Sequence, residues 1–221
     1  MDKFESIIPE SQALEILGPY FKTFAEIHEH AMQAFVNDGK YLTYKLTNGC
    51  KSTIIHDLIV DEAKNRLPFG KRCEQDTVDG LYIVIVEEVI ILRFKKLGND
   101  LTTSNQPSEQ AKRFNTQKSI LNGQQLRFSF IKEEPIIKPN AVNINVGYIP
   151  NRTLTGIHAL YMTAPRNDKK NLWQYLFYVD GNLLSHDKPG IQEVASTKEQ
   201  KRYIVDVQNH LKKDSAGEKT D

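Results

Sequence analysis

The stretch that decides the fold runs from Asp79 to Asp100 and reads DGLYIVIVEEVIILRFKKLGND. Two runs of β-branched and other apolar residues flank a pair of glutamates, and the second run ends in basic residues. Near-continuous apolar runs of this kind are typical of strands that are covered on both faces. We therefore expect a central hairpin at about residues 80–97, with a charged end where a site can be built.

The register of this hairpin depends on its turn. A two-residue turn at the glutamate pair would place Tyr82 opposite Arg93 and Asp79 opposite Lys96. Tyr82, Arg93 and Lys95 would then share one face of the sheet. Glutamate is unfavourable in such turns, which prefer Gly or Asn, and a longer turn would shift the register. A slip of one residue exchanges the two faces, so the assignment of Arg93 to a face stays open.

The rest of the chain predicts an α+β fold with a mainly antiparallel sheet. Apolar residues recur at spacings of three and four in the first half, whereas the C-terminal half alternates like strands. The expected helices span about residues 11–37, 52–67 and 108–121, and the expected later strands span 142–148, 154–163 and 172–179. Gly18-Pro19 interrupts the first helix, and the polar segment 69–79 reads as an exposed loop. We expect these helices to pack on the sheet.

The composition limits the domain organisation and the location of the protein. We expect one domain over residues 1–187 and a charged tail over 188–221, partly helical or disordered. The 29 Lys and Arg residues against 28 Asp and Glu give a net charge of +1, which provides no global attraction to nucleic acid or membrane. The chain begins without an apolar signal region and has no membrane-spanning run, so we expect a cytoplasmic protein without a membrane partner. The two cysteines are expected to be reduced, and the sequence leaves the oligomeric state open.

Two residues stand on apolar helix faces where charge is unexpected. His28 lies on the apolar stripe of the first helix, and we expect a core histidine bonded to a carbonyl oxygen. Glu62 lies on the apolar face of the second helix, where an unpaired carboxylate would be costly. It either pairs with Arg66, one helical turn later, or acts as a functional carboxylate that faces the hairpin.

Glu62, Asp79 and Lys95 follow one another as a helix glutamate, a strand-opening aspartate and a strand lysine. This order resembles that of PD-(D/E)xK nucleases, which hold Mg²⁺ with carboxylates beside a lysine. The resemblance implies a Mg²⁺-dependent nuclease or toxin-like enzyme with catalytic Glu62, Asp79 and Lys95. The position two before the lysine is Arg93, where the family has an acidic ligand. The resemblance covers about a fifth of the chain, so this enzyme is the alternative hypothesis.

Clusters of basic residues support a different function. The candidate binding residues are Tyr82, Arg93, Lys95, Lys96, Arg166, Lys169 and Lys170. If folding brings two clusters together, they form an anion-binding patch suited to phosphate contacts and stacking. The competing interpretation is a solvated surface that balances nearby acids. We favour a non-enzymatic interaction or regulatory protein without a cofactor that binds a protein partner or nucleic acid, as accessory components of bacterial or phage systems do, including toxin–antitoxin and phage-defence systems.

Overall fold

The computed structural model describes residues 7–39, 45–67, 73–78, 81–103, 109–117, 137–166 and 170–184. The chain divides into two compact units, Met1–Leu184 and Ser185–Asp221, and all described residues belong to the first. The predicted tail over 188–221 and the predicted site residues Asp79 and Lys169 lie outside the described residues.

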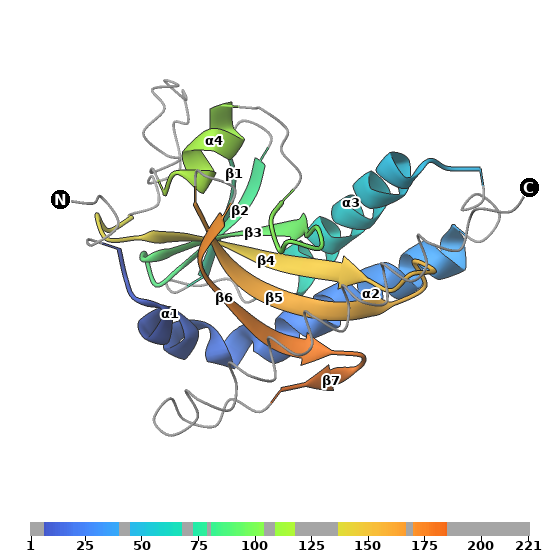
Figure 1. The fold of residues 1–221 in the computed structure, drawn as a ribbon, viewed down its shortest axis with the longest axis horizontal. Helices are drawn as coiled ribbons and strands as arrows, with labels where there is room; N and C mark the ends of the chain where they lie inside the picture. Colours follow the sequence, from blue (N-terminus) through green and yellow to red (C-terminus); the bar gives the residue numbers. More distant parts are fainter. Residues whose placement is uncertain are drawn as a thin grey trace, which may run out of the picture. The chain divides into compact units, whose positions relative to one another are not determined.

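A seven-stranded sheet with helices on both faces forms the described part of the chain (Figure 1). The helices are α1 (Glu10–Leu17), the 3-10 helix η1 (Gly18–Tyr20), α2 (Phe21–Asp38), α3 (Asn48–Arg66) and α4 (Glu109–Asn115). The strands are β1 (Cys73–Val78), β2 (Leu81–Val86), β3 (Ile90–Lys96), β4 (Val142–Pro150), β5 (Ile157–Arg166), β6 (Lys170–Val179) and β7 (Asn182–Leu183). They lie in sequence order, and every neighbouring pair is antiparallel except β3 and β4. The predicted α+β fold with a mainly antiparallel sheet is confirmed.

The connection between the parallel strands β3 and β4 places a helix on the second face of the sheet. Parallel neighbours need a crossover connection, and α4 lies in the connection between these two strands. Phe114 of α4 packs with Ile83, Ile85 and Ile91, whereas α1, α2 and α3 pack against residues that alternate with these. We call the first surface of the sheet the α4 face and the second the helix face.

The helices begin and end where local chemistry directs them. The 3-10 turn of η1 at Gly18-Pro19 interrupts the first helix, as the sequence indicated. α3 begins at Asn48, earlier than predicted, because the Thr47 hydroxyl caps the helix by accepting a hydrogen bond from the Cys50 N–H. α4 ends at Asn115, earlier than predicted, and the last predicted helix residues, 118–121, lie outside the described residues. Gln117 adopts a left-handed backbone conformation with φ of 56°, which an α-helix cannot include.

The segment predicted to be an exposed loop contains an edge strand. Cys73–Val78 forms β1 and pairs along its whole length with β2. Cys73 is buried while its neighbour Glu74 is exposed. Charged residues on the outer side of an edge strand hinder edge-to-edge association, and they lowered the apparent strand propensity of this segment.

The hairpin of β2 and β3 has a turn one residue longer than the simplest register. Val86 pairs with Ile90 and Val84 with Leu92. Glu87 and Glu88 both adopt positive φ, of 52° and 62°, a conformation that is costly for residues with a side chain. The extra residue exchanges the faces, as a one-residue slip must. The predicted pairing of Tyr82 with Arg93 is therefore wrong, and Tyr82 stacks on Phe94 instead.

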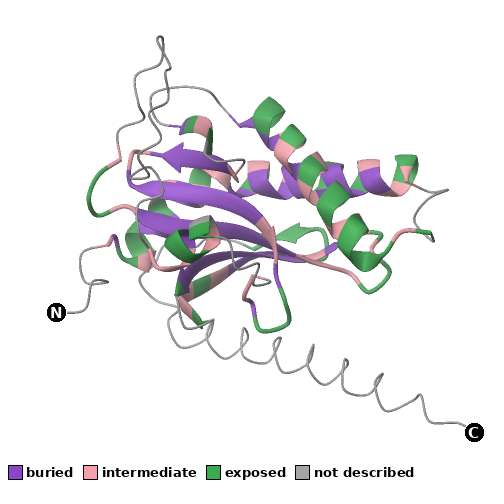
Figure 2. Cartoon of the chain, turned by 90° about the horizontal axis from the view of Figure 1, so that it is seen from above, coloured by how far each residue is buried: buried purple, intermediate pink, exposed green. Residues whose placement is uncertain are grey.

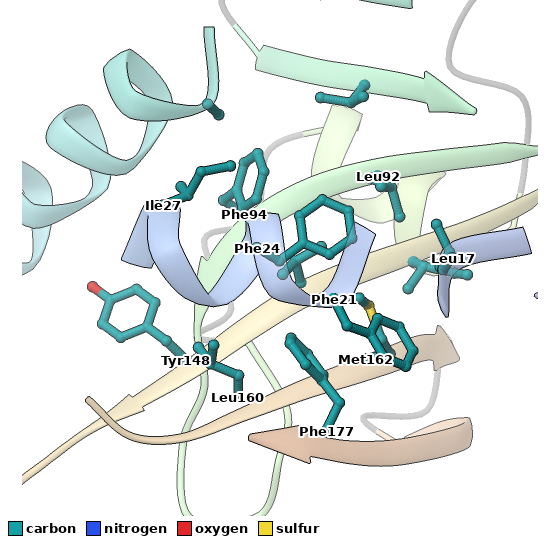
Figure 3. Packing of buried hydrophobic residues seen from close by; sticks show 14 of the residues in the cluster. Leu17, Phe21, Phe24, Ile27, Leu92, Phe94, Tyr148, Leu160, Met162 and Phe177 are labelled. Carbon is teal, nitrogen blue, oxygen red and sulfur yellow. The ribbon is translucent and has the colours of Figure 1, made fainter. Parts of the chain in front are cut away.

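The core lies between the helix face of the sheet and helices α1, α2 and α3. Aromatic side chains fill it, with the Phe21 and Phe177 rings 4.9 Å apart and the Phe24 and Phe94 rings 6.2 Å apart (Figure 3). Strands β2 to β5 are buried along most of their length (Figure 2). Among the described helices, none has the length and apolar character needed to cross a membrane.

Candidate functional site

A row of buried polar side chains crosses the α4 face of the sheet. Arg93 of β3 pairs with Asn145 of β4, and Asn145 pairs with Thr163 of β5. These three residues and Asn143 are at most 2% exposed, although they stand in the central strands. Polar side chains in such a place are costly unless they bond to one another. Their arrangement therefore decides what this face can do.

Arg93 is held by neutral groups. Its Nε donates to Asn145 Oδ1 at 2.6 Å, and its Nη2 donates to Asn115 Oδ1, at the end of α4, at 2.9 Å. Its guanidinium carbon lies 4.0 Å from the centre of the Phe114 ring, which is a cation–π contact. The network extends to β5, because Asn145 Nδ2 donates a hydrogen bond to Thr163 Oγ1 at 3.2 Å.

The end of α4 is fastened to the sheet by a second amide group. Gln117 Nε2 donates to the carbonyl oxygens of Asn143 and Pro165, at 3.1 and 2.9 Å. Its Oε1 accepts from the Asn143 N–H at 2.7 Å, and Asn143 Nδ2 donates to the Phe114 carbonyl oxygen at 3.0 Å. The left-handed conformation of Gln117 directs this side chain back over the strands. Four hydrogen bonds thus fix the helix that covers Arg93.

The positive charge of Arg93 is not neutralised within the described part of the chain. No carboxylate among the described residues lies within ion-pair distance of its guanidinium. Burial lowers the pKa of Arg93 to about 9, so the group still carries its charge at neutral pH. Lys95 lies two residues further along β3, on the same face by strand alternation. Burial, and then the charge of Arg93, lowers the pKa of Lys95.

The structure separates the other predicted binding residues from Arg93. Tyr82 lies on the helix face, where its hydroxyl donates to Gln75 Oε1 at 2.8 Å. Lys96 is also directed to the helix face, and its Nζ donates to Ser52 Oγ of α3 at 3.2 Å. The predicted grouping of Tyr82 with Arg93 and Lys95 on one face is therefore wrong. Arg93 and Lys95 remain together.

Arg166 and Lys170 pair with each other where β5 meets β6. Arg166 stands three residues beyond Thr163, towards the start of β4, whereas Lys96 pairs with Tyr148 near its end. These positions are six residue steps apart, or about 20 Å along the strands. The basic clusters thus occupy opposite ends of the sheet and form no common patch among the described residues.

The alternative hypothesis makes Glu62 a catalytic carboxylate, but the structure places Glu62 in a bond to a neighbouring arginine. The Glu62 carboxylate accepts a hydrogen bond from Arg66 Nε, and Arg66 Nη2 donates to His30 Nδ1 at 2.8 Å. The structural interpretation of Glu62 is confirmed. Among the described residues, no group of three His, Cys, Asp or Glu side chains is arranged to hold a metal ion.

Most of the network could not be expected from the sequence. Asn143 and Asn145 alternate with Val142, Ile144 and Val146, which is the signal of a strand with a polar inner face. Asn115 and Gln117 offered no comparable signal, because they reach the sheet only through the fold. Comparisons of the chain with protein-family models, curated proteins and solved structures gave no match.

Proposed function

We propose that this chain is an interaction protein that recognises an acidic group of a protein partner on the α4 face, with Arg93 as the anchor. The observation that supports this proposal is a buried guanidinium whose partners are two amide oxygens and an aromatic ring. These groups supply hydrogen bonds and polarisation but no negative charge. An external anion supplies what they lack.

The energetics favour such an anion. Burying a charge without a counter-charge is costly, and a charge-assisted hydrogen bond is about twice as strong as a neutral one. Lys95 adds a second cation beside Arg93, and the two repel each other, which is one cause of the lowered pKa of Lys95. One bound anion relieves both the missing counter-charge and this repulsion. The interaction costs little rearrangement, because the network already fixes the guanidinium.

The spread of basic residues favours a protein partner over nucleic acid. A nucleic-acid backbone is bound by several cations that follow it over successive phosphates. Here Arg166 and Lys170 stand about 20 Å along the strands from Lys96, and Arg93 stands between them and is 2% exposed. One deep arginine with one neighbouring lysine suits a single acidic side chain or a chain-terminal carboxylate.

Fluorescence anisotropy tests the proposal with two labelled probes, a Glu/Ser peptide with a free carboxyl end and a single-stranded oligonucleotide of equal length. We expect saturable binding of the peptide, weakened at least tenfold by Arg93→Gln and several-fold by Lys95→Gln. The half-exposed Lys95 provides a variant that leaves the buried network intact. Arg113→Gln, an exposed arginine on the same helix as Asn115, is the matched control and should bind like the wild type.

Each other result overturns the proposal. Binding of the oligonucleotide alone would identify a nucleic-acid partner, and equal peptide binding by the Lys95 and Arg113 variants would place the contact elsewhere. Absence of binding to both probes by the folded wild type would remove the α4 face as a recognition surface.

The Mg²⁺-dependent nuclease stays a prediction from the sequence, and no described contact favours it. Incubating the protein with plasmid or RNA and Mg²⁺ or Mn²⁺, beside a Glu62→Gln variant, tests it directly. Metal-dependent cleavage that disappears in the variant would replace the binding proposal by the enzyme.

A further inference from the structure

The two asparagines that hold Arg93 occupy one edge of its guanidinium group. An arginine side chain has five N–H donors in a planar fork, and Nε and Nη2 share one of its two outer edges. Asn145 accepts from Nε and Asn115 accepts from Nη2. Their two amide oxygens therefore accept from nitrogens that an internal carboxylate could otherwise bind.

The opposite edge of the guanidinium is unfilled within the described part of the chain. Nη1 has no hydrogen-bond partner among the described residues, and Nη2 keeps a second N–H beyond the one given to Asn115. These N–H groups form the end-on fork of arginine, whose spacing matches the two oxygens of a carboxylate. Among the described residues, the protein thus bonds Nε and one N–H of Nη2, and leaves Nη1 and the second N–H of Nη2 for a ligand.

We infer that Asn115 and Asn145 are specificity-determining residues that keep Arg93 oriented yet un-neutralised, so that its Nη1/Nη2 edge takes one carboxylate of the ligand. This inference rests on the proposed function and adds the guanidinium N–H groups that bind the carboxylate and the residues that select it. An aspartate at either position has nearly the same shape as asparagine but would supply the counter-charge itself. The side chains that bond in this network are amides, from Asn115, Gln117, Asn143 and Asn145, together with Thr163.

The donors left on the guanidinium point to a carboxylate before a phosphate. Nε and one N–H of Nη2 already donate to asparagines, so the remaining N–H groups of Nη1 and Nη2 can bind one planar group with two oxygens. Lys95 is half-buried and lies two residues away on the same face, where it adds attraction without a second fork. The fork can bind two oxygens of either group, but a phosphate has further oxygens that need donors beyond this one edge.

Titration of the folded protein with sodium acetate, and separately with sodium phosphate, at constant ionic strength set with sodium chloride tests this inference. The readout is the melting temperature as a function of anion concentration, because a ligand that binds only the native state raises it by mass action. We expect acetate to bind more tightly than phosphate, and Asn115→Asp to weaken acetate binding at least tenfold. Asn37→Asp makes the same change at an exposed position in the last turn of α2, and it should leave the acetate response unchanged.

The outcomes separate the inference from the proposed function. If the wild type responds to neither anion, both are wrong. If the wild type responds to acetate and Asn115→Asp responds equally, the selective role of the asparagines is wrong while the anion site stands. Tighter binding of phosphate would overturn the assignment to a carboxylate. Asn145→Asp supplies the same counter-charge from β4 and decides the question if Asn115→Asp does not fold.

Discussion

Different interactions hold the helices on the two faces of the sheet. On the helix face, Phe94 meets the ring of Phe24, and apolar contacts fill the space (Figure 3). Phe94 also meets the ring of His28. On the α4 face, Arg93 from the neighbouring position of the same strand meets amides, and hydrogen bonds hold a seven-residue helix in place. Apolar burial stabilises the fold roughly in proportion to the buried area, whereas a buried charge contributes little net stability. The helix face therefore contributes most of the apolar burial, and the α4 face holds the buried charge on which the proposed recognition rests.

The helix face also contains buried polar groups, but the ones described next are neutral. The fully buried His28 donates from Nδ1 to the Phe24 carbonyl oxygen at 2.7 Å, as the sequence predicted. Its Nε2 and the hydroxyl of the buried Tyr148 have no hydrogen-bond partner within the described structure. The helix face thus buries neutral polar atoms without partners among the described residues, whereas the α4 face buries the charged guanidinium of Arg93.

Paired phenylalanine truncations test the division with the largest effect. Phe94→Ala should lower the free energy of unfolding by about 3–5 kcal/mol, because it opens a cavity in the large aromatic core. Phe114→Ala, the matched change on the α4 face, should cost clearly less, because its apolar cluster is small. Urea denaturation measures both losses. Equal losses would mean that the two faces contribute alike to stability.

Acid should weaken the helix face through His28. Burial lowers the pKa of His28 to about 4 from an ordinary value of 6.5, so the unfolded chain binds a proton more readily than the native protein. Stability is then complete above pH 6.5, falls as the pH drops towards 4, and loses about 3 kcal/mol over that window. Urea denaturation across this pH range measures the loss. His28→Leu should flatten the profile, and an unchanged slope in that variant would assign the acid sensitivity elsewhere.

Removing the amide group that fastens α4 should loosen the α4 face alone. Gln117→Ala deletes three hydrogen bonds to the backbone of β4 and β5, at a cost of about 1–3 kcal/mol. Hydrogen exchange of the α4 amides should then accelerate at least tenfold, while exchange in α2 stays as in the wild type. Gln33→Ala, at an exposed position on α2, is the control. Equal acceleration in both helices would show that the two faces are one cooperative unit.

The turn that decides which residues face α4 is itself strained. Glu88→Gly should raise the free energy of unfolding by about 1 kcal/mol, because glycine adopts positive φ without steric cost. Glu88→Ala removes the same exposed ion pair with Lys138 but retains the Cβ atom, so it should bring no gain. Thermal unfolding of the two variants measures the difference. A gain from alanine equal to that from glycine would move the cause from the backbone to the charge.

Local signals in the sequence predicted the elements but not their partners. Helical periodicity identified α2 and α3, and alternation identified β4 to β6, because these patterns report burial on one face. The turn at Glu87–Glu88 needed one extra residue, and that single residue moved Arg93 to the opposite face from Tyr82. A local pattern cannot give this register when the turn residues are unfavourable for every short turn.

The candidate site was half visible in the sequence. Arg93 and Lys95 were selected as binding residues, and the structure keeps them together on one face. Asn115 reaches Arg93 only because β3 and β4 pair in parallel and α4 crosses between them. Contacts between residues so far apart in the chain depend on topology, which composition and periodicity do not encode.

Nuclear magnetic resonance of the arginine side chains tests the central claim most directly. The Nε–H resonance of Arg93 is followed while sodium acetate replaces sodium chloride at constant ionic strength. We predict a shift that saturates for Arg93, while the exposed Arg113 gives none. A resonance of Arg93 that stays fixed, or that drifts in parallel with Arg113, would contradict the claim that its buried charge awaits an external carboxylate.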